Sequence, residues 1–165
     1  MRVLVTGASG QLGWEMKKQS TLFDLEIYAF QKTGLNIIDR KQLTETIEAY
    51  NPDIIVNTAA YTSVDLAEKH QEQAYSLNHL AVENLAKICK EKSIFLIHLS
   101  TDYVFDGSGT TPWQTDDPVR PLGAYGRSKL KGEVGVSDSG GEYIILRTSW
   151  IFSAYGVNFL KTMLH

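Results

Sequence analysis

Residues 2–13 read RVLVTGASGQLG, and this stretch decides the fold. Its first half is a compact, β-branched apolar run, which is typical of a strand that is buried on both faces. The run ends at Gly7, and the residues that follow Gly10 include Leu12 and Met16 at helical spacing. The chain is therefore predicted to begin with a strand, a glycine turn and a helix.

The same alternation continues along the rest of the chain. Further strands are predicted at residues 25–30, 54–60, 93–100 and 142–150, and further helices at 40–50, 74–92, around Tyr125 and from 157 onward. Because the strands are apolar throughout and helices separate them, the pattern predicts an α/β fold, a doubly wound parallel sheet of Rossmann type with helices on both faces. No repeat or linker divides the chain, so residues 1–165 are expected to form one domain.

The composition of the chain restricts the classes of partner and site that can be expected. The formal net charge of −3 offers no general attraction to nucleic acid or to an anionic membrane, so neither partner is expected. The opening apolar run is too short for a signal peptide or a membrane span. One cysteine, Cys89, rules out an internal disulfide, and the four histidines have no metal-ligand spacing, so no metal site is predicted. We expect a reduced, cytoplasmic protein.

Three glycines follow the first strand at three-residue spacing: Gly7, Gly10 and Gly13. In a strand–turn–helix unit the first permits a tight turn, the second lets the backbone approach a pyrophosphate, and the third lets the helix pack closely. The helix N-terminus adds free N–H groups and the positive end of its dipole. The motif predicts a dinucleotide site.

The choice of dinucleotide stays open. The second strand ends in Gln31 and Lys32, where an NAD site usually has an acidic residue for the ribose diol. Lys32 could pair with a 2′-phosphate, which favours NADP(H) over NAD(H), or it could be an ordinary solvated lysine.

A second motif lies further along the chain. Ser100 and Thr101 follow the apolar run IFLIHL, at the end of a strand where open α/β sheets bind ligands. Tyr125 and Lys129 are four residues apart and so share one helix face. A nearby ammonium lowers the pKa of a phenol and can hold a ribose hydroxyl. We expect a hydroxyl to bond a substrate carbonyl while Tyr125 delivers a proton and nicotinamide supplies the hydride.

Four stretches, TGASGQLGWE, VNTAAYTSVDLAE, STDYVFDG with YGRSK, and RTSWIF followed by NFLKTML, together resemble the extended short-chain dehydrogenase/reductases. The closest resemblance is to the dTDP-4-dehydrorhamnose reductase family. It implies NAD(P)H-dependent reduction of the C4 ketone of a nucleotide sugar, a dTDP-4-keto-6-deoxy sugar.

The resemblance also assigns residues. It implies a catalytic trio of Thr101, Tyr125 and Lys129, with Tyr125 as the proton donor, and it places Asn78 where relatives position the catalytic lysine. Taken with the glycine motif, the expected cofactor-binding residues are Gly7, Gly10, Gln11, Leu12, Gly13, Lys32, Asn36, Ile37, Ala59, Ala60, Tyr61, Thr62, Ser100, Tyr125 and Lys129. The expected substrate-binding residues are Thr101, Asp102, Tyr103 and Trp150.

Other functions remain open at this point. Nucleotide-sugar epimerases and dehydratases share the trio and the glycine loop, and a regulatory subunit related to these reductases binds NADP without obvious turnover. Family members run well beyond 165 residues, so we expect a fragment of a longer reductase that lacks most of the substrate lobe. The sequence leaves a homodimer open.

Overall fold

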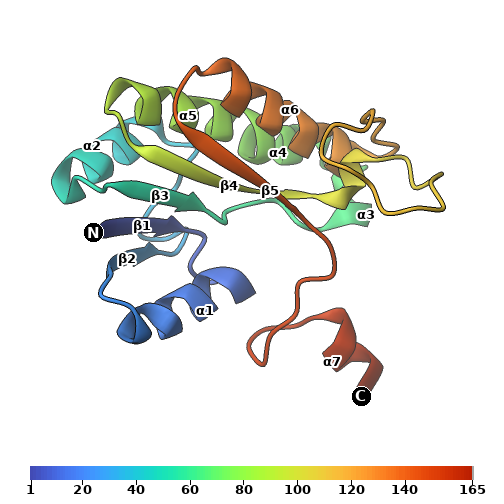
Figure 1. The fold of residues 1–165 in the computed structure, drawn as a ribbon, viewed down its shortest axis with the longest axis horizontal. Coiled ribbons are helices and arrows are strands. Elements are labelled where there is room, and N and C mark those ends of the chain that lie inside the picture. The colour runs from blue at the N-terminus through green and yellow to red at the C-terminus, as the bar shows by residue number, and fades with distance from the viewer. Residues whose placement is uncertain (165) are drawn as a thin grey trace.

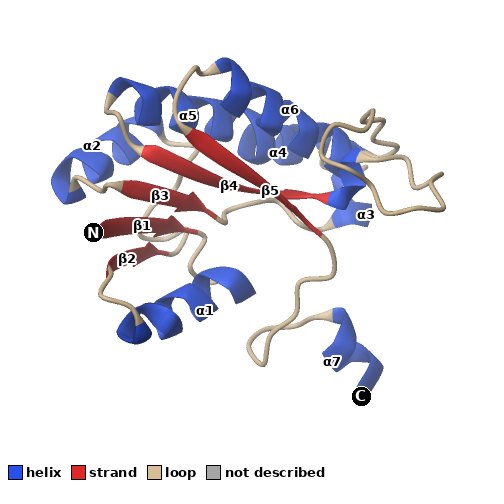
Figure 2. Ribbon diagram, in the orientation of Figure 1, coloured by secondary structure: helices blue, strands red, loops and turns tan. Residues whose placement is uncertain are grey.

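The computed structural model describes residues 1–164, except for the side chain of Thr21. Its centre is a five-stranded parallel sheet in the order β2-β1-β3-β4-β5 (Figures 1 and 2). The strands are β1 (Arg2–Thr6), β2 (Glu26–Phe30), β3 (Ile54–Asn57), β4 (Phe95–Thr101) and β5 (Tyr143–Thr148). The predicted parallel sheet is confirmed, whereas its strand order could not be derived from the sequence.

Helices cover both faces of this sheet. They are α1 (Gln11–Gln19), η1 (Ser20–Leu22), α2 (Arg40–Tyr50), α3 (Val64–Ala67), α4 (Gln71–Tyr75), η2 (Ser76–Leu80), α5 (Ala81–Glu91), η3 (Asp102–Val104), α6 (Ala124–Asp138) and α7 (Phe159–Leu164). Figure 1 shows α2, α4, α5 and α6 together on one side and α1 on the other. The α/β architecture with helices on both faces is thus the one predicted.

Several element boundaries differ from the prediction. The helix expected at 74–92 begins at Gln71 as α4, and its centre, η2, is a π-helical turn. The strand expected at 54–60 ends at Asn57. The last strand ends at Thr148 because Trp150 adopts a left-handed backbone with φ of 53°, which cannot continue a strand. The short helices α3 and η3 were not predicted.

Each face of the sheet has its own apolar core. Leu4, Ile55 and Leu96 pack against α2 and α5, whereas Val3 and Val5 pack on the opposite side, near Met16 of α1. Side chains alternate between the two faces of a strand. The strands are apolar throughout because both alternating sets are covered.

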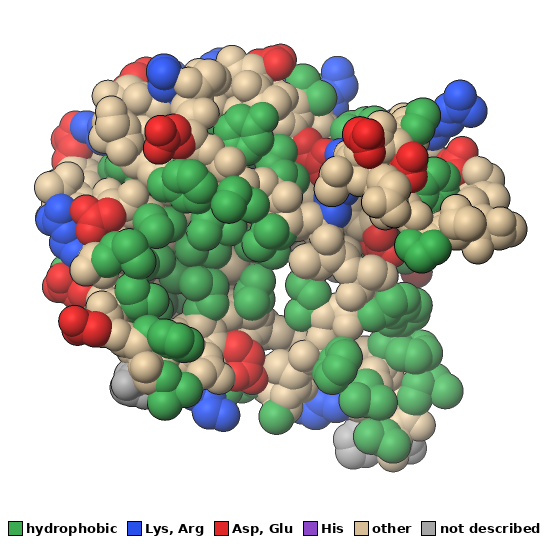
Figure 3. All heavy atoms as spheres, in the orientation of Figure 1, with side chains coloured by type: hydrophobic (Ala, Val, Ile, Leu, Met, Phe, Trp, Pro, Cys, Tyr) green, Lys and Arg blue, Asp and Glu red, His purple; other side chains and the backbone are tan. Residues whose placement is uncertain are grey.

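The edge strand β5 is less covered on the α1 side. Ile145 packs into the core beneath α5, so its neighbours Ile144 and Leu146 point the other way, where they are 46% and 45% exposed. Figure 3 shows apolar side chains gathered on this side of the molecule.

Close approach at the glycine turn explains two of the three glycines. Gly7 has φ of +70°, and a Cβ there would lie 2.6 Å from the backbone nitrogen of Ala59. A Cβ on Gly13 would lie 2.6 Å from Cα of Ala8, so α1 can pack on the turn only without a side chain. A Cβ on Gly10 would meet only the Gly7 carbonyl, at 3.3 Å. Packing therefore restricts Gly10 far less than Gly7 or Gly13, and its backbone conformation does not require glycine.

This difference gives a stability test. Gly13→Ala should lower the free energy of unfolding by about 2 kcal/mol or more, because its methyl group collides with backbone atoms that cannot move aside. Gly10→Ala should lower it by less than about 1 kcal/mol, the range of a changed helix N-cap. Urea denaturation of the two variants measures both values. Equal losses would contradict the packing argument.

Candidate active site

The site lies where the strand order reverses. From β1 the chain passes outward to β2 and later returns to add β3 on the opposite side of β1. The loops at the carboxyl ends of β1 and β3 therefore diverge and leave a crevice, which is where open α/β sheets bind ligands. Two adjoining cavities of about 400 and 270 Å³ lie here. They share Ser9, Gly10, Thr58, Ala60 and Thr62, and we call them together the glycine cleft.

The glycine cleft brings together most of the residues predicted to bind a cofactor. Its larger cavity is lined by Gly10, Gln11, Leu12, Ala60, Thr62, Ser100, Tyr125 and Lys129, and its smaller cavity by Gly7, Gly10, Lys32, Asn36, Ile37, Ala59, Ala60 and Thr62. Two predicted residues line neither cavity. Gly13 is buried against the turn, and Tyr61 is held through its backbone N–H and C=O by the side chain of Asn78.

Some cleft residues were missed by the sequence analysis. They are Ser9, Thr58, Leu77, Leu99, Leu35, Thr148, Ile151, Gly156 and Val157. Ser9 and Thr58 lie inside the motif stretches and could have been found there. Gly156 and Val157 arrive from a loop that the side chain of Gln11 holds, since Gln11 Oε1 accepts hydrogen bonds from Ser153 N (3.1 Å) and Asn158 Nδ2 (2.9 Å).

The cleft fits the diphosphate of a dinucleotide. No side chain caps the N-terminus of α1, which begins at Gln11 on the cleft wall. Gly10 presents bare backbone there, so an anion can approach the first N–H groups of the helix. Within the described part of the chain, the hydroxyl oxygen of Ser100 is buried and has no hydrogen-bond partner, although it lines the same cavity. A buried polar atom without a partner is costly unless a ligand or water satisfies it.

The predicted trio surrounds the far end of the cleft. Thr101 is the last residue of β4, and Tyr125 lies in the first turn of α6, where the Thr101 hydroxyl is near enough to influence the phenol. Thr101 Oγ1 lies 3.1 Å from Asp102 Oδ1, to which it donates, and it accepts from Tyr103 N at 3.2 Å. Burial raises the pKa of Tyr125, an effect that the nearby Thr101 hydroxyl opposes. Tyr125 therefore holds its proton at neutral pH.

Lys129 differs from its predicted arrangement. Its amine donates to the Leu99 carbonyl at 2.5 Å and lies 3.4 Å from His98 Nε2, and the residue is only 2% exposed. Burial lowers the pKa of Lys129 to about 8, against the opposing charge of Glu133. The predicted lowering of the Tyr125 pKa by Lys129 is therefore wrong for this arrangement, because the amine is directed at the β4 backbone and burial dominates at the phenol.

Asn78 was expected to position Lys129 through water, which stays a prediction, and its side chain makes three direct hydrogen bonds to other groups. Its Oδ1 accepts from Tyr61 N at 2.8 Å, and its Nδ2 donates to Tyr61 O at 3.1 Å and to Ser128 Oγ at 2.9 Å. Asn78 thus joins the loop after β3 to α6 at Ser128, the residue before Lys129, and has no direct hydrogen bond to Lys129.

The position of α6 depends on a residue from another element. Gly123, the residue before the helix, offers no capping side chain, and Glu68 Oε1 accepts a hydrogen bond from Ala124 N at 2.6 Å instead. Gly126 and Gly132 allow the helix to approach the backbone of Tyr103 and Asn78, which a Cβ at either position would overlap. The sequence suggested no such role for Glu68, because the two partners are 56 residues apart.

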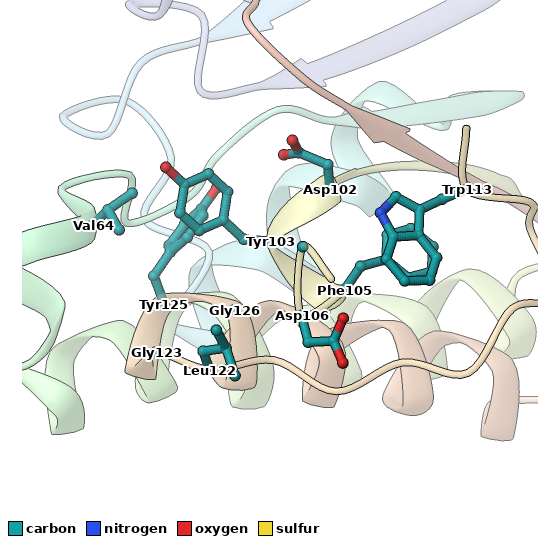
Figure 4. Close-up of a pocket in the computed structure, with 11 residues that line it drawn as sticks. Val64, Asp102, Tyr103, Phe105, Asp106, Trp113, Leu122, Gly123, Tyr125 and Gly126 are labelled. Atoms are coloured by element: carbon teal, nitrogen blue, oxygen red, sulfur yellow. The ribbon is translucent and has the colours of Figure 1, made fainter. Parts of the chain in front are cut away.

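A third cavity, of about 350 Å³, lies on the other side of Tyr125 (Figure 4). We call it the aromatic pocket, and it is lined by Val64, Asp102, Tyr103, Phe105, Asp106, Gly107, Trp113, Leu122, Gly123, Tyr125 and Gly126. Phe105 and Trp113 stack with ring centroids 4.7 Å apart, and the Arg147 guanidinium lies 5.1 Å from the Phe105 centroid. Figure 4 shows Tyr103 and Tyr125 side by side at one end of this pocket.

Two of the predicted substrate-binding residues line the aromatic pocket, namely Asp102 and Tyr103. Thr101 adjoins it through its hydrogen bond to Asp102. Trp150 lines none of the described cavities. It is 70% exposed, and its ring meets the edge of Phe159 in α7.

Residues 1–164 contain neither a metal-ligand cluster nor a membrane-spanning helix. No cluster of three or more His, Cys, Asp or Glu side chains among them could hold a metal ion. No helix in this described part of the chain is long and apolar enough to cross a membrane.

Comparison with known proteins identifies the family. The family model described as the RmlD substrate binding domain matches residues 1–165. The chain belongs to this family. The resemblance seen in the motif stretches is thereby confirmed.

Curated relatives match nearly the whole of this RmlD-family chain. It is 41% identical to a dTDP-4-dehydrorhamnose reductase of Salmonella typhimurium, over 99% of this chain and 56% of the relative. It is 42% identical to the spore coat polysaccharide biosynthesis protein SpsK of Bacillus subtilis, over 99% and 58%. The chain thus spans somewhat more than half the length of the curated relatives it matches.

Solved structures agree with the fold. The structure of dTDP-4-dehydrorhamnose reductase from Bacillus anthracis, in complex with NADP, matches with a TM-score of 0.95 at 38% identity, over 99% of this chain and 58% of that chain. A UDP-glucose 4-epimerase of Thermus thermophilus, in complex with NAD, matches with a TM-score of 0.80 over 89% and 54%, but at 22% identity it supports the fold alone.

The buried amine of this RmlD-family chain predicts a pH dependence. The pKa of Lys129 falls from 10.5 to about 8 on folding, so above pH 8 the unfolded chain keeps a proton that the folded chain has lost. Its contribution to stability should therefore rise with pH, by about 2 kcal/mol between pH 8 and pH 10. The measurement is the difference in free energy of unfolding between wild type and Lys129→Met across this range. A difference that stays flat would contradict the burial of the ammonium.

Proposed function

We propose that this chain carries the cofactor site and the proton donor of an NAD(P)H-dependent reductase that converts dTDP-4-dehydrorhamnose to dTDP-L-rhamnose. The observation that carries the proposal is the position of Tyr125. Its side chain lines both the glycine cleft and the aromatic pocket. A proton donor in that place can reach a substrate on one side while a cofactor occupies the other.

Three residues of the chain would have separate roles in the reduction of a ketone. Bound nicotinamide would supply the hydride to the ketone carbon. Tyr125, whose pKa is raised by burial, would give the proton at its hydroxyl to the ketone oxygen. Thr101, whose hydroxyl lies near the phenol, would orient the ketone oxygen, and Lys129, which lines the cleft, would bind a ribose hydroxyl. These roles of Thr101, Tyr125 and Lys129 are those that the family resemblance implies.

The glycine cleft would hold the dinucleotide along its length. Its diphosphate fits the uncapped start of α1, and the orphaned Ser100 hydroxyl offers a partner deeper in the cleft. Lys32 at the smaller cavity supports NADP(H), since an ammonium there can pair with a 2′-phosphate. The bound NADP of the Bacillus anthracis relative supports the same choice.

The aromatic pocket would hold the sugar. The acidic side chains of Asp102 and Asp106 can accept hydrogen bonds from sugar hydroxyls, and the rings of Tyr103, Phe105 and Trp113 offer apolar walls. The names of relatives about 41% identical support a dTDP-linked substrate. Cytoplasmic location and assembly as a homodimer stay predictions.

Replacing the proton donor tests the mechanism. Tyr125→Phe should lower the rate of ketone reduction by about 10²–10⁴-fold, because a phenyl ring cannot donate a proton. Its affinity for the cofactor should change little. Turnover is measured as NAD(P)H oxidation with dTDP-4-dehydrorhamnose, and the control is Tyr143→Phe at the opposite end of the sheet. Unchanged turnover in Tyr125→Phe would remove Tyr125 from the reaction.

A fluorescence titration tests the cofactor. NADPH should bind this chain more tightly than NADH, and Lys32→Ala should erase most of that preference, because it removes the partner of the 2′-phosphate. Equal affinities would contradict the Lys32 contact. Tightly retained NAD in the purified chain would instead favour an epimerase, and binding of both cofactors without any turnover would favour a regulatory subunit.

A further inference from the structure

One row of buried polar side chains crosses the sheet and ends at the catalytic lysine. Thr6, Asn57 and His98 are neighbours in register on β1, β3 and β4, so their side chains lie on the same face. Each is at most 1% exposed. His98 then approaches Lys129 of α6, with its Nε2 at 3.4 Å from the amine. Buried polar groups arranged in this way must satisfy one another, because water does not reach them.

The bonds along the row have one direction. Thr6 Oγ1 donates to Asn57 Oδ1 at 2.6 Å and accepts from Ala59 N at 3.4 Å, so the Thr6 proton is committed to the amide oxygen. The other end of the amide, Nδ2, lies 3.0 Å from His98 Nδ1 and can only donate to it. The reverse orientation of the amide would leave the hydroxyl of Thr6 without this acceptor.

This direction fixes the proton on the imidazole. His98 is fully buried, and burial together with the charge of Lys129 lowers its pKa well below the ordinary value, so the ring is neutral. Because Nδ1 accepts from Asn57, the single ring proton resides on Nε2. That N–H is the group that faces the Lys129 amine.

The consequence for Lys129 follows from hydrogen-bonding capacity. An ammonium has three donors and no acceptor, so it opposes the Nε2–H of His98, whereas an uncharged amine has a lone pair that can accept from it. The other titratable groups near the lysine are Tyr125 and Glu133 of α6. Glu133 favours the charged amine, but its own carboxylate is held by Arg147 of β5 at 2.8 Å.

We propose that His98 is a positioning residue that holds the Lys129 amine at the Leu99 carbonyl and, through the proton on Nε2, favours its uncharged form. The row thereby links Thr6, which directly precedes the glycine turn, to the charge of the lysine at the far end of the cleft. The inference rests on the proposed function only in taking Lys129 as the catalytic lysine.

Nitrogen NMR of the full chain with ¹⁵N-labelled histidine tests the first half of this proposal without any substitution. We expect the His98 ring to stay neutral from pH 5.5 to pH 9, with its proton on Nε2. A proton on Nδ1, or a ring that titrates near its ordinary value of about 6.5, would overturn the proposal. The exposed ring of His70 serves as the reference signal.

A substitution that reverses the direction of the hydrogen bond between residue 57 and His98 tests the second half of the proposal, the effect on Lys129. In Asn57→Asp a carboxylate accepts from both Thr6 and His98, so the ring proton moves to Nδ1 and Nε2 becomes an acceptor for the ammonium. The titration midpoint of Lys129, followed by NMR of ¹³C-labelled lysine and assigned with Lys129→Met, should rise by about one pH unit or more.

The double variant Asn57→Asp/His98→Leu separates the ring from the new negative charge. In the His98→Leu background, which has no imidazole ring, Asn57→Asp should shift the titration midpoint of Lys129 by less than half as much as it does in the wild type. A shift of the same size with and without His98 would show that the ring transmits nothing, and the proposal would fail. None of these measurements needs cofactor or turnover, so loss of the proposed reductase activity would leave the result for His98 intact.

Discussion

Close backbone contact at the first turn is the constraint on which the rest of the structure depends. The turn that follows β1 must pass within contact distance of Ala59 on one side, and α1 must rest directly on Ala8 on the other. Gly7 allows the first approach because it has no side chain, and Gly13 allows the second for the same reason. Because α1 then starts at the point where the loops after β1 and β3 diverge, the uncapped helix terminus and the crevice of the sheet coincide. The glycine cleft is a direct result of this packing.

The second half of the site is held by contacts that reach across the chain. Glu68 caps α6, and Asn78 joins the loop after β3 to the same helix. Two glycines let α6 lie against neighbouring backbone, so Tyr125 is fixed at the wall between two cavities. The role proposed for Tyr125 needs such a fixed place, since small displacements from a productive geometry carry a large cost in rate.

Local patterns predicted much of the architecture. Apolar runs and helical spacing gave the alternating strands and helices, because side-chain period reflects the local backbone. The Gly7, Gly10 and Gly13 spacing and the four-residue separation of Tyr125 and Lys129 also act within single elements. The predictions went wrong where neighbours in space intervened. Lys129 was expected to act on the phenol, and its amine instead lies between the Leu99 carbonyl and His98.

The sequence by itself therefore determined the type and order of the elements, the glycine turn and the shared helix face of Tyr125 and Lys129. Each of these features depends on residues that are only a few positions apart. The tertiary structure alone decided the order β2-β1-β3-β4-β5, the capping of α6 by Glu68, the row from Thr6 to Lys129 and the exposed place of Trp150. Those features depend on which buried donor meets which acceptor. Such a meeting is set by the packing of segments that lie far apart along the chain, and no local period encodes it.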